Sequence, residues 1–366
     1  MIHGQEIKAN HEKWMNRSLS LAIQGLNGAS PNPYVGCVLV KNNRLISKGA
    51  HLRFGGPHAE VNALRAAGPK ARGSKLYVNL EPCSHWGKTP PCADLIIRSG
   101  VSQVIVGMVD PNPLVRGKGI AALRRAGIRV LTRIRSKEAM DLNRSFIKYI
   151  TQKQPYVYLK TACSLDGKIG SVSGQSKWIT SAESRAYSHG LRSQMDAVLI
   201  GANTLRKDRP SLTSHGQGRN PVRVILTASG QIPSPAAPPD QGSVTWVIHS
   251  NPSFKLKTTP GAEWFYLPGN SKGIPFARIL DFLGNRGISR LLIEGGGTTS
   301  AAALESNCVD EIIFFYAPIL IGGKGAKSVF DGNGFKDLLQ APKVQDLKIK
   351  KIGPDLILNG RIRSQG

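Results

Sequence analysis

Three side chains in the first hundred residues have the types and the spacing of a metal site. His58 is followed by Cys83 and, nine positions later, by Cys92. One imidazole and two thiolates form a zinc ligand set that leaves a coordination position open for water. Glu60 lies two residues after the histidine, close enough for its carboxylate to exchange protons with that water. The set predicts a catalytic zinc site.

This arrangement predicts a hydrolytic deamination. The order His-x-Glu, Pro-Cys and a second Cys is the signature of the zinc deaminases. Zinc lowers the pKa of a bound water to about 7, so hydroxide can attack a ring carbon that bears an amino group. Glu60 would take the proton of the water and deliver it to the ring nitrogen and to the leaving ammonia. This reaction needs no organic cofactor.

A structural zinc site with four protein ligands is the alternative. His85 lies between the two cysteines and could be the fourth ligand. We expect His58 in the first turn of one helix, Cys92 at the start of another, and Cys83 just after a strand. Two helix N-termini would then meet at one place and favour thiolate and hydroxide over thiol and water. This placement favours the open, catalytic site.

The elements that must position these residues alternate between helix and strand. Alternation of this kind implies a largely parallel sheet with helices on its faces. Periodicity and turn residues predict helices over residues 12–25, 60–67, 93–99, 120–126 and 141–150. They predict strands over residues 35–40, 44–51, 75–80, 104–108 and 129–131.

A linker at 151–155 divides the chain into expected domains 1–150 and 151–366. The second domain is also predicted to be α/β, with a proline-rich surface loop at 233–239. A strand that runs into a glycine turn, with a helix starting near Thr299, could bind phosphate, although a tight turn without a ligand gives the same pattern. The expected strands are 156–161, 196–201, 222–226, 244–249, 290–293 and 311–316, and the expected helices are 181–194 and 276–283.

Composition limits the class of protein. The 366 residues carry a net charge of +26, which attracts nucleic acid, phosphorylated metabolites or dinucleotides, unless it reflects a general bias towards Lys and Arg. No basic stripe with interleaved aromatics indicates nucleic-acid binding. No apolar run is long enough to cross a membrane, and the first residues do not form a signal peptide. Five scattered cysteines favour the reducing cytosol, so we expect a cytoplasmic protein.

Four motifs of the first half resemble the deaminase part of the bifunctional riboflavin biosynthesis enzymes. Eight residues separate Cys83 from Cys92, a spacing that cytidine and tRNA-adenosine deaminases do not share. The resemblance implies a cytidine-deaminase-like α/β/α domain that acts on 2,5-diamino-6-ribosylamino-4(3H)-pyrimidinone 5′-phosphate. The motifs are Pro31-Asn32-Pro33-x-Val35-Gly36, Pro57-His58-Ala59-Glu60-Val61, the run from Pro82 to Cys92, and Asp110-Pro111-Asn112-Pro113.

The same resemblance implies that Asn32, His51, His85 and Lys88 line the pocket of the deaminase substrate. Their chemistry agrees, because an amide can pair with a pyrimidine edge or a ribose hydroxyl and a cation can hold a phosphate. The sequence also fits a simpler reading, in which Lys88 is a solvated loop residue and Asn32, between two prolines, is a turn residue.

Motifs of the second half resemble the reductase part of the same family, which has a fold like dihydrofolate reductase. They include Lys160 to Lys168 and Ser176 to Thr180. The resemblance implies that NADPH reduces the ribosyl group of the deaminated product to ribityl. The implied NADPH contacts are Ala162, Trp178, Thr204, Asp208, Gly295, Gly296, Gly297, Thr298 and Thr299, and the implied substrate contacts are Lys160, Ser176, Arg192, Leu212 and Glu294.

Roles within this second set stay open. Lys160 and Glu294 are both candidates for the proton donor, and each could instead be a structural ion-pair partner. The guanidinium of Arg192 suits the substrate phosphate, but the residue could also be an exposed helix arginine. The sequence departs from the family pattern at Arg209, at Ser214-His215 and at Thr227-Ala228. These changes bear on cofactor and phosphate contacts.

The leading hypothesis is an enzyme that deaminates and then reduces one phosphorylated pyrimidine, with Zn²⁺ and NADPH as cofactors. A nucleic-acid-editing deaminase is one alternative, and the cysteine spacing and the complete second domain argue against it. The other is a chain whose second domain only binds a ligand or a partner. Related enzymes suggest a homo-oligomer. The residues before His11 have no assigned role.

Overall fold

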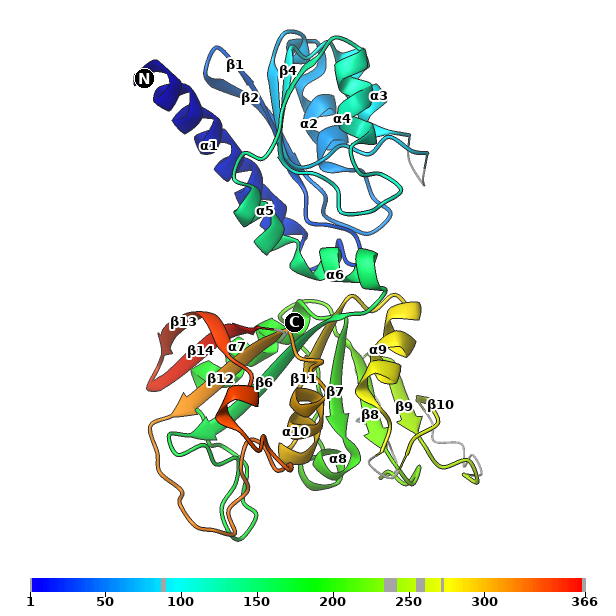
Figure 1. The fold of residues 1–366 in the computed structure, drawn as a ribbon, viewed down its shortest axis with the longest axis vertical. Coiled ribbons are helices and arrows are strands. Elements are labelled where there is room, and N and C mark those ends of the chain that lie inside the picture. Colours follow the sequence, from blue (N-terminus) through cyan, green and yellow to red (C-terminus); the bar gives the residue numbers. More distant parts are fainter. Residues whose placement is uncertain (1, 87–89, 234–241, 255–260, 271–272, 364–366) are drawn as a thin grey trace. The chain divides into compact units, whose positions relative to one another are not determined.

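We describe the protein from a computed structural model that covers residues 2–86, 90–233, 242–254, 261–270 and 273–363. The chain forms two compact units, Met1–Lys153 and Gln154–Gly366. Each unit is an α/β structure with its own sheet and core (Figure 1).

The first unit has a five-stranded mixed sheet in the order β2-β1-β3-β4-β5. Strand β1 runs antiparallel to both β2 and β3, whereas β3, β4 and β5 are parallel. The expected largely parallel sheet is therefore wrong for this half, because β1 and β2 form a hairpin at one edge. The strands are β1 (Gly36–Lys41), β2 (Arg44–Ala50), β3 (Lys75–Leu80), β4 (Gln103–Met108) and β5 (Arg129–Leu131).

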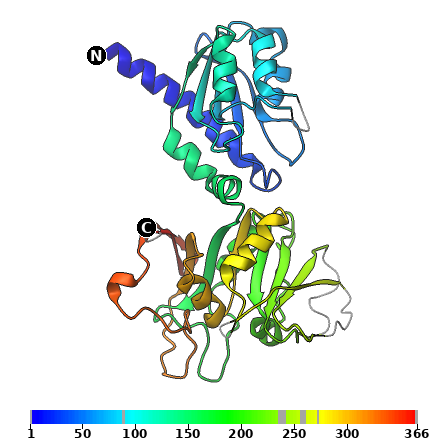
Figure 2. The same ribbon diagram turned by 45° about the vertical axis from the view of Figure 1, so that its right-hand side comes forward.

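Helices cover both faces of this sheet, as Figures 1 and 2 show. Side chains alternate along β1: Cys37 and Leu39 join the core beneath α2 and α3, whereas Val38 and Val40 pack with Trp14 of α1. The helices are α1 (Ile2–Ala22), α2 (Ala59–Ala67), α3 (Cys92–Ser99), α4 (Lys118–Arg125), α5 (Ser136–Leu142) and α6 (Arg144–Gln152), with 3-10 turns at Ile23–Gly25 and Gly68–Ala71.

Two expectations for this unit are wrong in detail. Helix α1 begins at Ile2, ten residues before the expected start, so the segment before His11 is helical. The helix expected over residues 141–150 is two helices, and α6 extends into the expected linker. The break between the two helices lies at Asn143. The side-chain amide of Asn143 accepts a hydrogen bond from Tyr34 N at 2.7 Å and donates one to Tyr34 O at 3.1 Å. Side-chain bonds of this kind compete with the helix backbone.

The second unit has a nine-stranded sheet in the order β10-β9-β8-β7-β11-β6-β12-β14-β13. The pairings from β10 to β12 are parallel, and the pairings of β14 with β12 and β13 are antiparallel. The strands are β6 (Tyr156–Ser164), β7 (Ala197–Gly201), β8 (Val222–Thr227), β9 (Thr245–His249), β10 (Ala262–Tyr266), β11 (Arg290–Ile293), β12 (Glu311–Ala317), β13 (Val344–Ile352) and β14 (Asp355–Ile362).

Two cores lie on opposite faces of this sheet. Helices α9 (Phe276–Asn285) and α10 (Gly297–Glu305) pack on one face, and α7 (Ala182–Ser193) and α8 (Ala202–Asp208) contribute to the other. The sequence patterns missed α8 and the strands β10, β13 and β14. Strand β13 is exposed along nearly all of its length, so it lacks the buried alternation that identifies a strand. The proline-rich loop expected at 233–239 lies almost entirely outside the described residues.

Candidate active sites

The three predicted metal ligands lie together in the first unit. His58 is the residue before α2, Cys92 is the first residue of α3, and Cys83 follows β3. His58 Nδ1 lies 3.2 Å from Cys92 Sγ and 3.6 Å from Cys83 Sγ, and all three ligand atoms are within 4.8 Å of one another. Tetrahedral zinc, with bonds of about 2.0 Å to nitrogen and 2.3 Å to sulfur, places its ligand atoms about 3.5–3.8 Å apart. The geometry and the donor set therefore fit Zn²⁺.

The surroundings of Cys83 favour the thiolate form that binds a cation. Hydrogen bonds from the Cys92 thiol and from His58 lower the pKa of Cys83 to about 4, despite burial. The pKa of Cys92 is raised, first because its thiol donates to Cys83 and second because it is buried. The backbone N–H of Cys92, at the start of α3, also donates to Cys83 Sγ at 3.3 Å, which favours thiolate.

Glu60 lies in the first turn of α2, directly beside this group. Its side chain is only 4% exposed. Burial, followed by the negative charge of Cys83, raises the pKa of Glu60 to about 7. A carboxyl group with a pKa near neutrality can both accept and donate a proton at physiological pH.

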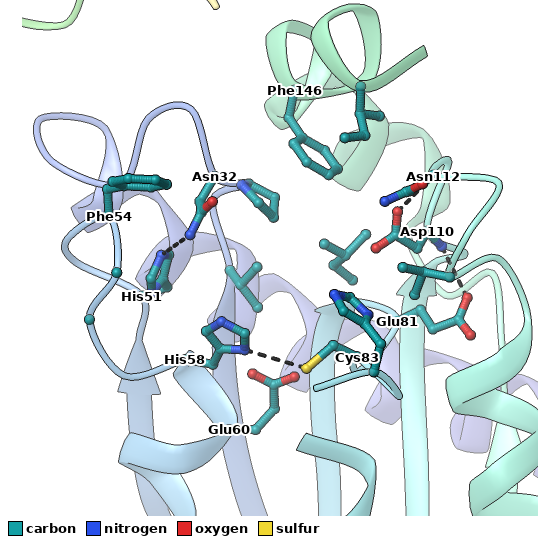
Figure 3. A pocket seen from close by; sticks show the side chains of 18 residues that line it. Asn32, His51, Phe54, His58, Glu60, Glu81, Cys83, Asp110, Asn112 and Phe146 are labelled. Carbon is teal, nitrogen blue, oxygen red and sulfur yellow. Dashed lines mark hydrogen bonds between the residues drawn. The ribbon is translucent and has the colours of Figure 1, made fainter. Parts of the chain in front are cut away.

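A cavity of about 330 Å³ opens above these residues (Figure 3). His58, Glu60 and Cys83 form part of its wall. Asn32 Nδ2 donates to His51 Nε2 at 3.1 Å, which leaves Nδ1–H of His51 to donate to the carbonyl of Pro57 at 3.0 Å. Burial lowers the pKa of His51, in keeping with this neutral form. The amide oxygen of Asn32 is thereby oriented as an acceptor at the cavity.

His85 and Lys88 are the other two pocket residues that the resemblance implies. His85 lines the cavity. Among the described residues, the group of possible metal ligands comprises His58, Cys83 and Cys92, so the four-ligand alternative with His85 has no support in this geometry. Lys88 lies outside the described residues.

Sequence reasoning assigned no role to Glu81, Asp110, Asn112 and Phe146, all of which line the same cavity (Figure 3). The carboxylate of Glu81 accepts hydrogen bonds from four backbone N–H groups, those of Asp110, Gly117, Gly119 and Ile120, at 3.0 to 3.2 Å. Burial raises the pKa of Asp110 to about 6. The sequence does contain one indication that Asp110 and Asn112 belong to a site, namely their position just after β4. Ligand sites gather at the carboxyl ends of parallel strands.

The second unit has a larger cavity of about 900 Å³. It brings together nearly all residues that were predicted for the reductase site. Leu212 is the exception, because it is 2% exposed, packs in the core with Ile200 and Ile225, and does not line the cavity. The predicted residues that line it are Lys160, Ala162, Ser176, Trp178, Arg192, Thr204, Asp208, Glu294, Gly295, Gly296, Gly297, Thr298 and Thr299.

A buried cluster of charges lies at one end of this cavity. Arg192 donates from Nε and Nη2 to the two carboxylate oxygens of Glu294 at 2.9 and 2.8 Å, and from Nη1 to Thr213 O at 3.1 Å. Both side chains are about one-tenth exposed, at 11% and 10%, which rules out the exposed helix arginine. Burial would raise the pKa of Glu294, but the charges of Arg192 and Lys160 lower it to about 2.

Lys160 completes the cluster from β6. Burial lowers its pKa, and the charge of Glu294 only partly opposes that shift. Its ammonium group lies 5.0 Å from the centre of the Phe315 ring. The cluster therefore presents a buried lysine whose proton is held less tightly than usual, next to an ionised carboxylate.

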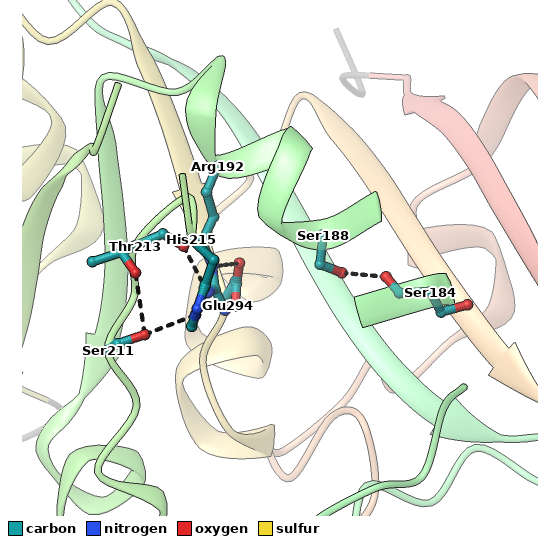
Figure 4. A network of polar contacts seen from close by, with 7 residues as sticks. All are labelled: Ser184, Ser188, Arg192, Ser211, Thr213, His215 and Glu294. Atoms are coloured by element: carbon teal, nitrogen blue, oxygen red, sulfur yellow. Dashed lines mark hydrogen bonds and ion pairs between the residues drawn. The ribbon is translucent and has the colours of Figure 1, made fainter. Parts of the chain in front are cut away.

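His215, one of the departures from the family pattern, lies near this pair (Figure 4). Its ring stacks on that of His189 with centroids 3.9 Å apart, and its Nε2 is 3.0 Å from Ser211 Oγ. Burial, followed by His215, lowers the pKa of His189 to about 4. The predicted departure is thus part of a polar network that also includes Arg192.

The glycine turn forms part of the cavity wall. Gly296 N donates to Thr204 Oγ1 at 3.2 Å, and Gly297 is the first residue of α10. A Cβ atom on Gly297 would lie 2.6 Å from Ser328 O, so no larger residue fits. A Cβ on Gly296 would lie 3.3 Å from Thr204 Oγ1 and fill part of the cradle. Exposed backbone N–H groups at a helix N-terminus fit the pyrophosphate of a dinucleotide.

The family models that match the chain correspond to the two units. The model of the cytidine and deoxycytidylate deaminase zinc-binding region matches residues 8–108. The model of the RibD C-terminal domain matches residues 155–358. In the part of the chain that the structure describes, no helix is long and apolar enough to span a membrane.

Relatives match along nearly the full length. The riboflavin biosynthesis protein RibD of Bacillus amyloliquefaciens is 42% identical over 95% of this chain and 95% of its own length. RibD of Escherichia coli K12 is 36% identical, over 95% of this chain and 98% of its own. The Thermotoga maritima structure of a diaminohydroxyphosphoribosylaminopyrimidine deaminase/5-amino-6-(5-phosphoribosylamino)uracil reductase superposes with a TM-score of 0.87 at 37% identity, covering 97% of this chain and 99% of that one. An Acinetobacter baumannii RibD structure gives a TM-score of 0.86 at 35% identity, covering 97% and 99%.

Proposed function

The chain belongs to the RibD family of riboflavin biosynthesis proteins, and from this premise we propose which of its residues carry the activities of the family. It is a bifunctional deaminase and reductase that uses Zn²⁺ and NADPH. The fold combines a cytidine-deaminase-like domain with a reductase domain. We assign deamination to residues 1–150 and reduction to residues 151–366, an assignment that the division into two compact units supports.

In the deaminase domain, His58, Cys83 and Cys92 hold the zinc ion. Their ligand atoms, all within 4.8 Å of one another beside Glu60, are the observation that carries the proposal. Zinc, when bound, supplies the Lewis acidity that makes water nucleophilic near neutral pH. Glu60 accepts one proton from water and passes it to the ring nitrogen, then carries the proton of the added hydroxyl group to the amino group, which leaves as ammonia; this role suits its raised pKa.

The deaminase substrate is the diaminopyrimidine ribosyl phosphate that the Thermotoga relative's name describes. Asn32, held by His51, contacts the pyrimidine edge or a ribose hydroxyl through its amide. His85 lines the cavity on the inter-cysteine loop, and with Lys88 it contacts the phosphate. The net charge of +26 favours a phosphorylated substrate in both domains.

In the reductase domain, NADPH supplies the hydride to the ribosyl C1 of the deaminated product. The glycine turn and Thr204 hold the pyrophosphate through backbone and hydroxyl groups. Ala162, Trp178 and Asp208 line the remainder of the dinucleotide site. Lys160, Ser176, Arg192 and Glu294 contact the substrate from the charged end of the cavity. Leu212, being buried, contributes by packing beneath the site.

Lys160 is the better candidate for the proton donor. Its ammonium group is buried and its pKa is lowered, so it releases a proton more readily than an exposed lysine. Glu294 is ionised at neutral pH, since its pKa is about 2, and it has no proton to give. Glu294 instead orients Arg192, whose bonds to Glu294 and Thr213 leave two N–H groups for a substrate phosphate.

Lys160, Arg192 and Glu294 are all present at the charged end of the cavity. Their presence supports a working reductase rather than a domain that only binds a ligand. We propose a homo-oligomer, as related enzymes suggest. We also propose a cytoplasmic location, because the five cysteines, free among the described residues, suit a reducing compartment. Full-length similarity to riboflavin enzymes argues against nucleic-acid editing.

One experiment tests both halves. Purified protein is assayed for zinc content, for ammonia release from the diaminopyrimidine phosphate, and for NADPH oxidation with the deaminated product. Glu60→Gln should keep zinc and the reductase activity while deamination falls by about 10²- to 10⁴-fold, the usual contribution of a general acid or base. Substantial deamination by this variant would remove Glu60 from the proton-transfer role. No NADPH oxidation by the wild type would leave the second domain as a ligand-binding one.

A further inference from the structure

The larger cavity continues past the glycine turn, away from the substrate end. Lys160 lies on β6, on one side of β11, whereas β7 and then β8 lie on the other side. At that far side the cavity is lined by Thr227, Ala228 and Ser229 at the end of β8, and by Arg206 of α8. The proposed function, on which this inference rests, has the pyrophosphate at the turn and the substrate, which the nicotinamide must face, at Lys160; the adenosine then extends towards β8.

Arg206 is fixed at this end of the cavity by two hydrogen bonds. Its Nη2 donates to the carbonyl of Gln231 at 2.7 Å, and its Nη1 donates to Asn203 Oδ1 at 2.6 Å. Thr227 Oγ1 donates to the same carbonyl at 3.4 Å, so the guanidinium is tied to the end of β8. A guanidinium has five N–H groups, and these two bonds leave three for a ligand.

The local charge favours a second phosphate here. The segment 222–233, which contains the end of β8, has no Asp or Glu. In dinucleotide sites an acidic residue beside the adenosine ribose binds the 2′-hydroxyl of NADH, whereas an arginine accommodates the 2′-phosphate of NADPH. A planar guanidinium can hold that phosphate through two parallel hydrogen bonds. We propose that Arg206 binds the 2′-phosphate and makes the second domain specific for NADPH over NADH.

Of the other cations that line the cavity, Lys207 and Lys327 come from the segments nearest to the glycine turn and to Arg206. They lie close together, since Lys327 is the main cause of a lowered pKa at Lys207. Lys327 precedes Ser328, whose carbonyl lies against Gly297 at the start of α10. The lysine pair is therefore at the pyrophosphate, whereas Arg206 is the cation tied to β8.

Binding of two nucleotides to the full-length protein tests the assignment without turnover. Adenosine 2′,5′-bisphosphate carries the 2′-phosphate, and 5′-AMP lacks it. By titration calorimetry, Arg206→Gln should raise the Kd of the bisphosphate about 10- to 100-fold, as expected for hydrogen bonds between charged groups. The Kd of 5′-AMP should change less than about 2-fold. Lys348→Gln, which removes the same charge from exposed β13 at the opposite edge of the sheet, should alter neither.

Three outcomes would overturn the assignment of Arg206. They are an unchanged bisphosphate Kd in Arg206→Gln, an equal loss for both nucleotides, and a selective loss in Lys207→Gln instead. Gly296→Ala distinguishes these three outcomes from a failure of the proposed dinucleotide site. A methyl group at the glycine turn should raise the Kd of both nucleotides. If Gly296→Ala binds both normally, the turn does not hold the pyrophosphate. If it weakens both while Arg206→Gln has no selective effect, only the role of Arg206 fails.

Discussion

The two sites of this protein use their residues in different ways. The proposed deaminase site gathers three ligand atoms within 4.8 Å beside one buried carboxyl, under a cavity of about 330 Å³. The proposed reductase site is a cavity of about 900 Å³ with a charged cluster at one end and a glycine turn in its wall. Where the protein itself must build the reacting centre, atoms from several elements converge. Where an organic cofactor brings the reacting group, the protein supplies binding and orientation over a long surface.

Removing zinc should have the largest effect and should separate the two activities. Dialysis against a chelator should lower deamination by at least about 10³-fold, since the metal contributes several kcal/mol to such reactions. NADPH-dependent reduction of the deaminated substrate should stay within about 2-fold of the untreated rate, an effect of under 1 kcal/mol. Both rates are measured on the same preparation, and adding Zn²⁺ back should restore deamination. A parallel loss of reduction would mean that the two sites are not independent.

Arg192→Ala is the corresponding test in the second domain. It leaves Glu294 buried without its main partner, and breaking a buried pair in this way costs about 3–5 kcal/mol of stability. The free energy of unfolding of the second domain, measured with denaturant, should fall, and the KM for the reductase substrate should rise. The rate of deamination should stay unchanged. The control is Lys348→Ala, at an exposed residue of the same domain. It should change the free energy of unfolding by less than about 0.5 kcal/mol. Normal stability with a raised KM would make Arg192 a substrate contact only.

The same ion pair predicts a pH dependence. The pKa of Glu294 is lowered from 4.5 to about 2, so its ionised form adds stability above pH 4.5 that is lost as the pH falls towards 2. The shift corresponds to about 3 kcal/mol. Between pH 6 and pH 2, the free energy of unfolding of the wild type should fall more steeply than that of Glu294→Gln. Equal slopes in urea unfolding would show that the pair does not stabilise the fold.

Glu81→Gln should have the smallest effect of the four. Its carboxylate accepts four backbone N–H groups and so fixes the turn that carries Asp110 and Asn112. A glutamine keeps one acceptor oxygen and loses the charge, so we expect an increase in the deaminase KM on the order of 10-fold, or about 1–2 kcal/mol. Zinc content, kcat and the reductase should change little. A fall in kcat with loss of zinc would instead show that Glu81 supports the metal site.

The deaminase site was largely predictable because its signals are local. The spacing of His58, Glu60, Cys83 and Cys92 indicated the ligand set, and the pattern of short helices and strands placed both helix starts correctly to within one residue. Glu81 was not found, because its four partners lie 29 to 39 residues further along the chain. A carboxylate that binds backbone N–H groups leaves no pattern of side-chain types.

The reductase site was predictable only through resemblance. Arg192 and Glu294 are 102 residues apart, and no periodicity connects them. Strand β13 was missed because both of its faces are exposed, and α8 was missed because its seven residues are too few for a helical period. Tertiary pairing creates these features, and the sequence alone does not display it.

Asn143 determines how the two activities could be separated. Its amide holds both the N–H and the C=O of Tyr34, two residues after the pocket residue Asn32, although the zinc-binding region matched by the deaminase family ends at residue 108. A polypeptide cut at residue 108 would release the substrate loop and would also lose Ile120, Leu123 and Phe146 from the core beneath α2 and α3. Gene fission, natural or engineered, is therefore expected to yield an active deaminase only when the cut falls beyond α6.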